Sequence, residues 1–241
     1  MTQTFRVETP VEGDVQFPQA SVQSESGDLR RVLVTVNDRH RCVYDALADE
    51  YNKKSSAHSA TTQDRVNYVA EYVASDSEIL DVGCGVGLAL LMLSRHKKEF
   101  KVTGVDISPR MAELARQRSP HTPVIVGDFL TVGFHTKYDL IWEQALLHLF
   151  PSIAESYIFE RFRALLNPDG ILSLSTTISA VSREGWETKK DYGAAPMRYR
   201  RSITEAELQA AFATYGFELL DRWVTTDPFG KSWLTVVGKK Q

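Results

Sequence analysis

The feature that most restricts the fold of this chain is a short apolar run that leads directly into a glycine-rich loop. Residues 78–82 are Glu-Ile-Leu-Asp-Val, and residues 83–87 are Gly-Cys-Gly-Val-Gly. The apolar run predicts a buried strand, and the glycines let the backbone turn sharply and approach a ligand. The apolar stretch that continues to about His96 predicts a helix packed on a sheet. This order is typical of open α/β sheets, which bind ligands beyond the carboxyl ends of their strands.

Strand-like and helix-like segments alternate along the rest of the chain. Further strands are expected at 101–105, 123–126, 139–142, 171–176, 217–224 and 233–238, and helices at 39–52, 63–74 and 108–118. This alternation predicts the α/β class, with a doubly wound and mostly parallel sheet. The two consecutive strands near residue 241 predict an antiparallel hairpin at one edge of that sheet.

Two segments carry the sequence pattern of a helix capping box, a hydroxyl residue followed three positions later by a glutamate. Ser152 and Glu155 form the first pair, and Thr204 and Glu207 form the second. In such a box each side chain accepts from the other residue's backbone N–H, so a helix is expected to begin at both places.

The first 37 residues differ in composition from the rest. They are rich in Ser, Gln and Glu, are interrupted by Pro and Gly, and contain one β-like run at 31–36. Residues 1–37 are therefore expected to be a partly flexible N-terminal extension. A tail without function is one interpretation, and a share in a homodimer contact or in an active-site cover is the other. Residues 38–241 are expected to form one domain, with 177–202 as a substrate-side insertion.

Charge and cysteine content restrict the partners of the chain. A net charge of −3 and a pI near 6.1 give no general attraction to nucleic acid or to anionic membranes. Cys42 and Cys84 show no metal-ligand spacing and are expected to be reduced thiols. The longest apolar run, 86–93, is too short to span a bilayer, and no signal peptide is visible. We expect a cytoplasmic protein without nucleic acid, membrane or metal partners.

Acidic residues end the next two expected strands. Asp106 follows the glycine loop at a spacing that suits hydrogen bonds to both ribose hydroxyls of a nucleotide. Asp128 would then lie near the adenine, with Phe129 or Ile107 covering a ring face; an Asx turn is the alternative for Asp128. The glycine spacing departs from the dinucleotide pattern, because Leu88 stands where that pattern needs Gly or Ala, and this disfavours NAD.

The ordered runs D-V-G-C-G-V-G, G-V-D-I-S, G-D-F and Y-D-L-I-W-E-Q-A-L-L-H-L resemble a class I S-adenosylmethionine-dependent methyltransferase of the small-molecule type, over about residues 41–241. The resemblance implies a Rossmann-like sheet of seven strands with an antiparallel C-terminal strand. It also implies S-adenosyl-L-methionine as the cofactor, with the glycines beside its methionine part. The residues expected to bind it are Asp81, Gly83, Cys84, Gly85, Gly87, Asp106, Ile107, Met111, Asp128, Phe129, Glu143 and Tyr51.

Methyl transfer from a sulfonium is an in-line displacement, to which alignment of the reactants contributes on the order of 7–11 kcal/mol. A general base is needed only when the acceptor reacts from a protonated form. His148 and Glu143 are the catalytic candidates after the fourth expected strand, and a structural histidine is the alternative for His148.

The segment 177–202 is expected to bind a small-molecule acceptor. Aromatic walls with a few fixed polar groups suit such a pocket, and Trp186, Tyr192 and Arg200 are the candidates. The cations of this segment favour an acceptor with a carboxylate or a phosphate. A solvated, charged loop is the alternative interpretation.

Three other functions stay open at this point. The chain is alternatively a methyltransferase for RNA, DNA or protein, a Rossmann-type oxidoreductase, or a non-catalytic S-adenosylmethionine-binding protein. Against methylation of a macromolecule stand the acidic net charge and the sequence Trp142-Glu143-Gln144 in place of an Asn/Asp-Pro-Pro-Tyr motif.

Overall fold

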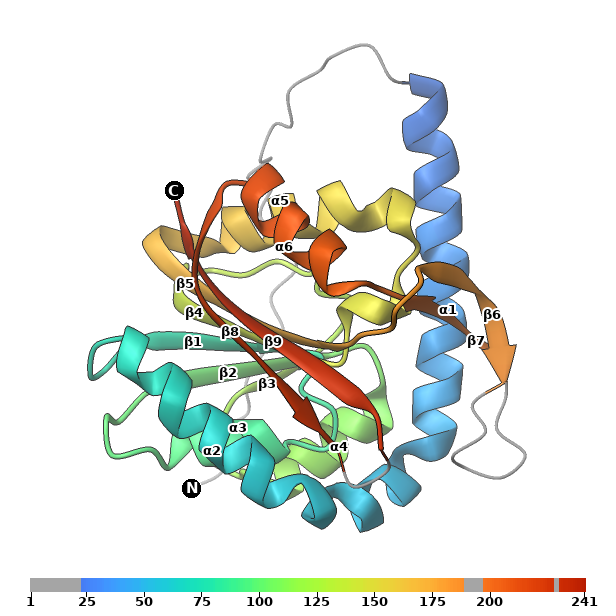
Figure 1. Ribbon diagram of the computed structural model, residues 1–241. Coiled ribbons are helices and arrows are strands. Elements are labelled where there is room, and N and C mark those ends of the chain that lie inside the picture. The colour runs from blue at the N-terminus through green and yellow to red at the C-terminus, as the bar shows by residue number, and fades with distance from the viewer. Residues whose placement is uncertain (1–22, 189–196, 228–229) are drawn as a thin grey trace.

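The computed structural model describes residues 23–188, 197–227 and 230–241, and its centre is a seven-stranded sheet with the strand order β3-β2-β1-β4-β5-β9-β8 (Figure 1). These strands are β1 (Glu78–Val82), β2 (Lys101–Asp106), β3 (Val124–Val126), β4 (Tyr138–Gln144), β5 (Leu166–Thr177), β8 (Phe217–Thr226) and β9 (Ser232–Lys240). Strand β9 runs antiparallel to both of its neighbours, and β1 to β5 are parallel. The predicted Rossmann-like α/β sheet with its C-terminal hairpin is confirmed.

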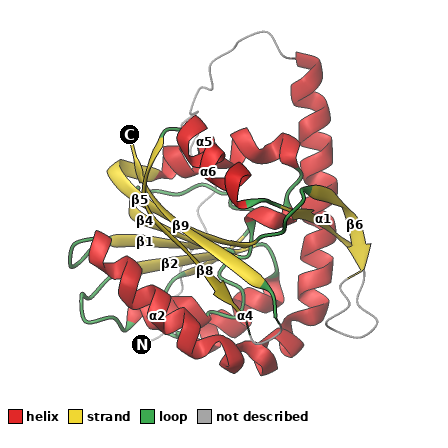
Figure 2. Cartoon of the chain, viewed as in Figure 1, coloured by secondary structure: helices red, strands yellow, loops and turns green. Residues whose placement is uncertain are grey.

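Helices cover both faces of the sheet, as Figure 2 shows by the red helices on either side of the yellow strands. They are α1 (Gln23–Lys54), α2 (Ser59–Val69), α3 (Leu88–Ser94), α4 (Pro109–Arg118), α5 (Glu155–Leu165) and α6 (Glu205–Thr214), with short 3-10 turns at Ser55–His58, Ala70–Tyr72, Leu147–Leu149 and Ser152–Ala154. None of the helices within the described residues is long and apolar enough to cross a membrane.

The central strands are apolar on both faces because each face meets a helical layer. In β1, Ile79 belongs to the core shared with α2 and α3. Its neighbour Leu80 belongs to the core shared with α5 and α6. In β4, Leu140 likewise belongs to the core shared with α2 and α3, and Ile141 belongs to the core shared with α5 and α6. Two-sided burial therefore explains why these strands appear in the sequence as unbroken apolar runs.

The expectation of a strand at 31–36 is wrong, because these residues lie inside the helix α1. Leu33, Val36, Val43 and Leu47 are buried at intervals of three, seven and four residues, whereas Val32 and Val34 between them are exposed. This is a helical period, and a six-residue window rich in β-branched residues is too short to reveal it. Helix α1 continues through the expected domain boundary at 37/38, and that division stays a prediction.

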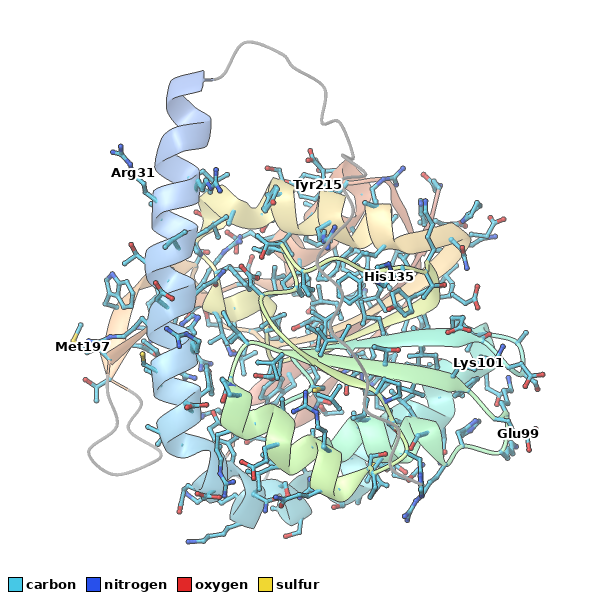
Figure 3. All side chains as sticks on the ribbon, turned by 180° about the vertical axis from the view of Figure 1, so that it is seen from behind. Arg31, Glu99, Lys101, His135, Met197 and Tyr215 are labelled. Atoms are coloured by element: carbon cyan, nitrogen blue, oxygen red, sulfur yellow. The ribbon has the colours of Figure 1, made fainter. Side chains whose placement is uncertain are left out.

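The segment 177–202, expected as a substrate-side insertion, contains a hairpin of two strands, β6 (Arg183–Thr188) and β7 (Met197–Ser202). Strand β7 packs beside α1. From behind, Arg31 of α1 and Met197 of β7 lie on the same side of the molecule (Figure 3). The residues that join the two strands, including Tyr192, lie outside the described residues.

One of the two expected capping boxes forms. Thr204 Oγ1 accepts from Glu207 N at 3.2 Å, and Glu207 Oε2 accepts from Thr204 N at 2.8 Å, so α6 begins as predicted. The box at Ser152 is wrong: a 3-10 turn precedes α5, and no side chain caps that helix. Ser152 N and Oγ instead donate to Glu184 of β6, at 2.7 and 2.8 Å.

Candidate active site

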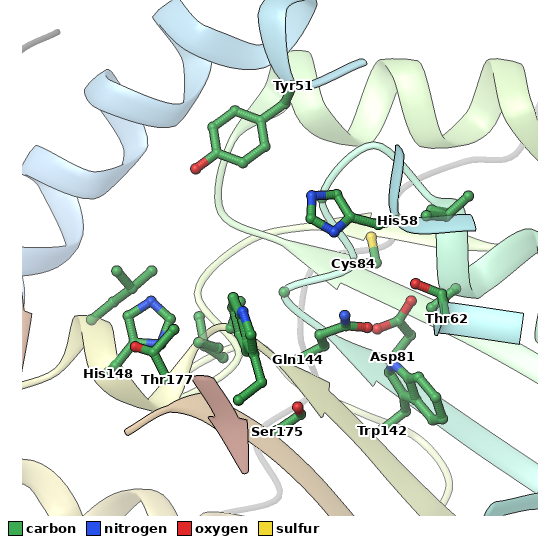
Figure 4. A pocket seen from close by; sticks show the side chains of 18 of the residues that line it. Tyr51, His58, Thr62, Asp81, Cys84, Trp142, Gln144, His148, Ser175 and Thr177 are labelled. Carbon is green, nitrogen blue, oxygen red and sulfur yellow. The ribbon is translucent and has the colours of Figure 1, made fainter. Parts of the chain in front are cut away.

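A pocket of about 1120 Å³ opens at the carboxyl ends of β1, β2, β3 and β4. It lies where the strand order reverses between β1 and β4, which is the usual ligand position in such sheets. Its other wall comes from α1, the turn Leu147–Leu149 and β7. In Figure 4, Asp81 and Gln144 lie on one side of the pocket, His148 and Thr177 lie on the other, and Tyr51 reaches in from α1.

The glycine loop after β1 has the left-handed backbone that only glycine adopts without strain. Gly83, Gly85 and Gly87 have φ angles of 69°, 53° and 78°. A Cβ on Gly85 would meet only the carbonyl oxygen of Gly83, at 4.0 Å, so the loop leaves room for a ligand. A Cβ on Gly87 would lie 2.8 Å from Ala115 Cα, so this glycine permits the close approach of α3 and α4. Gly83 and Gly85 line the pocket, and Gly87 lies behind it.

Two acids at the strand ends hold the backbone around the pocket. Asp106 Oδ2 accepts from Gly85 N at 2.8 Å, and Oδ1 accepts from Ser108 N at 2.9 Å. Burial raises the pKa of Asp106 to about 6, although both hydrogen bonds act in the opposite direction. Asp128 Oδ1 accepts from Leu130 N at 3.0 Å, which is the Asx-type turn considered as the alternative role. Its Oδ2 accepts from Asn37 of α1 at 2.7 Å.

Arg65 of α2 is a buried cation in the lining of the pocket, and it was not predicted from the sequence. Its Nη2 donates to the carbonyl oxygens of Glu143 and Ser173, at 2.8 and 3.0 Å, and its guanidinium carbon lies 3.9 Å from the ring centroid of Trp142. Its Nε and Nη1 have no hydrogen-bond partner among the described residues. Burial lowers the pKa of Arg65 to about 9, and the charges of Glu143 and Asp81 oppose that shift.

Asp81 at the end of β1 is also buried and incompletely bonded. Its Oδ2 has no hydrogen-bond partner within the described part of the chain. Burial raises the pKa of Asp81 to about 8, and the nearby Arg65 charge acts against that rise. Asp81 and Arg65 therefore place an unsatisfied acceptor and unsatisfied donors in the lining of one pocket.

Glu143 is fully buried and organises the loop after β4. Its Oε1 accepts from Leu146 N and Leu147 N, at 2.5 and 3.0 Å, and its Oε2 accepts from Ser175 N at 3.2 Å. Burial raises the pKa of Glu143 to about 7. Glu143 is not among the residues that line the pocket. The structure therefore places this catalytic candidate behind the wall, where it fixes the loop that carries His148.

His148 lines the pocket opposite the glycine loop. Its side chain is buried, with Nδ1 3.0 Å from Thr176 Oγ1 and its ring 6.1 Å from the ring of Trp233. The contact with the Thr176 hydroxyl holds the imidazole in one orientation. A histidine held in this way can receive a proton from a ligand in the pocket.

Of the residues predicted to bind the acceptor, Arg200 lies in the pocket lining and Trp186 does not. Arg200 lines the pocket and donates from Nη2 to Thr177 Oγ1 at 2.7 Å. Trp186 lies opposite Tyr199, and its ring packs against the Tyr199 ring rather than in the pocket lining. Because side chains alternate along a strand, the face that carries Tyr199 is opposite to the face that carries Arg200. Tyr192 lies outside the described residues.

Most of the predicted cofactor residues lie together. Asp81, Gly83, Cys84, Gly85, Asp106, Ile107, Met111, Asp128, Phe129 and Tyr51 all line this pocket. Asn37 and Arg65 also line the pocket and were not predicted, whereas Arg198 is one of the cations of the segment 177–202 that was expected to bind the acceptor. A lone arginine beside the apolar positions Val66 and Val69 was the available signal for Arg65. Among the described residues, no three His, Cys, Asp or Glu side chains are grouped so that they could hold a metal ion.

Comparison with known proteins identifies the family of this chain. Residues 79–170 match a methyltransferase domain family. A trans-aconitate 2-methyltransferase of Shigella flexneri serotype 5b (strain 8401) is 33% identical over 182 residues, covering 70% of this chain and 67% of that protein. The malonyl-[acyl-carrier protein] O-methyltransferase of Priestia megaterium is 31% identical over 141 residues, covering 58% of this chain and 48% of its own length.

Solved structures share the fold. The 1,6-didemethyltoxoflavin-N1-methyltransferase of Burkholderia thailandensis, crystallised with bound 1,6-didemethyltoxoflavin and S-adenosylhomocysteine, aligns with a TM-score of 0.62 and 20% identity, over 94% of this chain and 93% of that one. A parallel sheet with one antiparallel strand and a ligand pocket at its switch point defines a Rossmann-like ligand-binding protein. The chain belongs to the class I S-adenosylmethionine-dependent methyltransferases. S-adenosylmethionine is the cofactor of that family.

Proposed function

We propose that this chain transfers the methyl group of S-adenosylmethionine to an O, N, S or C atom of a small-molecule acceptor. The observation that carries the proposal is that one pocket joins the glycine loop and the acidic strand ends to a second polar wall, made by His148 and β7. When bound, S-adenosylmethionine supplies an electrophilic methyl group on a sulfonium. A pocket that holds both reactants provides the alignment that such a displacement needs.

The adenosine end of the cofactor would be held at β2 and β3. Each oxygen of Asp106 accepts one backbone N–H and keeps capacity for a further hydrogen bond, as two ribose hydroxyls require. Asp128 and Asn37 together present a carboxylate and an amide where the adenine edge would lie. The apolar side chains of Ile107 and Phe129, also in the lining, would cover the ring.

The amino-acid end would be held at the glycine loop. The residues fit such a group: among the described residues, one carboxylate oxygen of Asp81 lacks a partner and could accept from an ammonium, and two nitrogens of Arg65 lack partners and could donate to a carboxylate. Gly85 leaves open space between β1 and α3. Buried polar atoms are rarely left without partners, so this pair is explained by a ligand with both charges.

We assign His148 the role of proton acceptor for an acceptor that reacts from a protonated form. Replacing His148 by Asn should lower kcat by about 10²–10⁴-fold, because general-base assistance is worth that much. The affinity for S-adenosylhomocysteine should not change. The exposed His121→Asn variant is the matched control. Unchanged turnover of His148→Asn would leave alignment alone as the mechanism and make His148 structural.

We further propose a cytoplasmic enzyme that acts on free metabolites, with residues 177–202 supplying the acceptor side of the pocket. The net charge of −3 supports a small acceptor over a nucleic acid. The homodimer left open above stays a prediction, which light scattering would test.

Labelled methyl transfer tests the function. The protein is incubated with methyl-labelled S-adenosylmethionine and, separately, with a small-metabolite extract, total RNA and total protein. Label should enter the metabolite fraction. Label in RNA or protein would contradict the proposal. Cofactor binding without transfer to any fraction would instead indicate a non-catalytic binding protein.

A further inference from the structure

The acceptor side of the pocket carries two arginines on one face of β7. Arg198 and Arg200 are two positions apart, and both line the pocket. Alternate residues of a strand point to the same face, about 6.7 Å apart along the chain. The two guanidinium groups therefore face the same part of the pocket.

Arg198 is a buried cation that is only partly satisfied. Its side chain is 4% exposed, and Nη1 donates to the Tyr44 hydroxyl at 2.8 Å. Its Nε is buried and has no partner within the described residues. Burying a guanidinium in this way is unfavourable unless an anion compensates it, so the arrangement fits a site that a ligand completes.

Arg200 is the second arginine on this face of β7. Its side chain is 17% exposed, and Nη2 donates to Thr177 Oγ1 at 2.7 Å, which fixes the direction of the guanidinium. The residue directly across the hairpin is Gly185, which has no side chain. A Cβ added at Gly185 would meet no atom of the described residues within 4 Å, so these residues leave the space beside the pair open.

Among the described residues, Glu187 carries a carboxylate within 4 Å of both guanidinium groups. Glu187 Oε1 lies 3.9 Å from Arg198 Nη2 and 3.6 Å from Arg200 Nε, and both distances exceed those of charge-assisted hydrogen bonds. The Glu187 side chain is 47% exposed, so water screens its charge. Within the described residues, the two cations thus share the Glu187 carboxylate at distances longer than direct hydrogen bonds.

We propose that Arg198 and Arg200 bind a carboxylate of the methyl acceptor, so that the acceptor is a small organic acid. This inference rests on the proposed function. The planar fork of a guanidinium matches the two oxygens of a carboxylate, and two forks on one strand face fix its orientation as well as its charge. The orphaned Nε of Arg198 gains its hydrogen bond only when that anion is present.

Calorimetry on the complex with S-adenosylhomocysteine tests the inference. The full chain is first titrated with S-adenosylhomocysteine, and the saturated complex is then titrated with acetate, malonate, succinate, citrate and benzoate and with their uncharged amides. We expect at least one acid to bind at least about tenfold more tightly than its amide, since a hydrogen bond to a charged group is worth roughly that factor or more.

Four variants sharpen this test. Arg200→Met and Arg198→Lys should weaken binding of that acid by about 10- to 100-fold, while Arg183→Met, an exposed arginine of the same hairpin, should not. Glu187→Gln should tighten acid binding, because it removes the competing carboxylate, and misfolding cannot mimic such a gain.

The outcomes separate this inference from the proposed function. Equal binding of acids and amides, no binding of any acid, or unchanged acid affinity in both arginine variants would overturn the inference. Failure of the first titration, with S-adenosylhomocysteine alone, would overturn the proposed function instead.

Discussion

At the scale of single residues, the pocket lining holds two buried charged side chains, Asp81 and Arg65, that have polar atoms without a hydrogen-bond partner among the described residues. Burial raises the pKa of Asp81 and lowers the pKa of Arg65. The free energy lost by burying these charged groups without partners is recovered when a ligand provides the missing hydrogen bonds. The stability of the free protein and its affinity for the cofactor should therefore oppose each other at these residues.

The variant Asp81→Asn tests this opposition. Because the pKa of Asp81 is about 8 in the folded chain and near 4 when unfolded, folding favours the protonated acid. The cost of its charge is absent below about pH 4, grows as pH rises, and is complete above about pH 8. Asp81→Asn should thus melt a few °C higher than the wild type at pH 8–9, since about 1 kcal/mol shifts Tm by roughly 2–4 °C in a chain of this size.

The difference in Tm between Asp81→Asn and the wild type should disappear as the pH is lowered toward 4. The variant should also bind the cofactor more weakly than the wild type does. Scanning calorimetry across this pH range provides the measurement. Asp169→Asn, at an exposed carboxylate paired with Lys239, is the matched control. A lower Tm of Asp81→Asn at pH 8 would show that the charged carboxylate stabilises the free protein.

At the scale of elements, the approach of α3 to α4 depends on Gly87. Gly87→Ala should lower the free energy of unfolding by about 1–3 kcal/mol, because the new Cβ would overlap Ala115 and because the residue keeps a φ of 78°. Urea unfolding measures the loss. Gly133→Ala, where a Cβ meets nothing within 4 Å, should change little. Equal effects of the two substitutions would remove the packing argument for Gly87.

Elements with a strong local signal were predictable from the sequence, and elements set by distant partners were not. The box at Thr204 and the strand β1 follow from local pattern, and both are confirmed. Ser152 carries the same local pattern as Thr204, but its backbone N–H and its hydroxyl donate to Glu184, which lies 32 residues further along the chain. A short sequence window around Ser152 does not include Glu184, so it could not show that this side chain competes with the predicted capping box. The helix at 31–36 needed a longer window, which would have shown the buried face from Leu33 to Leu47.

At the scale of the whole molecule, helix α1 joins the two ends of the pocket. On the cofactor side, Asp45 accepts from Ser108 Oγ at the start of α4, at 2.7 Å. On the acceptor side, His40 lies 3.2 Å from the Tyr199 carbonyl oxygen, and Tyr44 accepts from Arg198. One helix therefore positions both walls, as its place beside β7 in Figure 1 indicates.

The same long-range assembly explains which site residues the sequence could reveal. Residues adjoining the ends of β1, β2 and β3 were predictable, because parallel strands bring their carboxyl ends to one edge. Asn37 and Arg65 come from α1 and α2, and only the packing of these elements brings them to the pocket. Their sequence positions show no spacing that links them.

The most direct test of the central claim is calorimetric titration of this chain with S-adenosylmethionine, S-adenosylhomocysteine and NAD. The first two should bind once per chain with dissociation constants of about micromolar, and NAD should not bind. Asp106→Ala should weaken both by at least about tenfold, through loss of two hydrogen bonds to a charged group. Binding of NAD, or affinity for S-adenosylhomocysteine that Asp106→Ala leaves unchanged, would contradict the account.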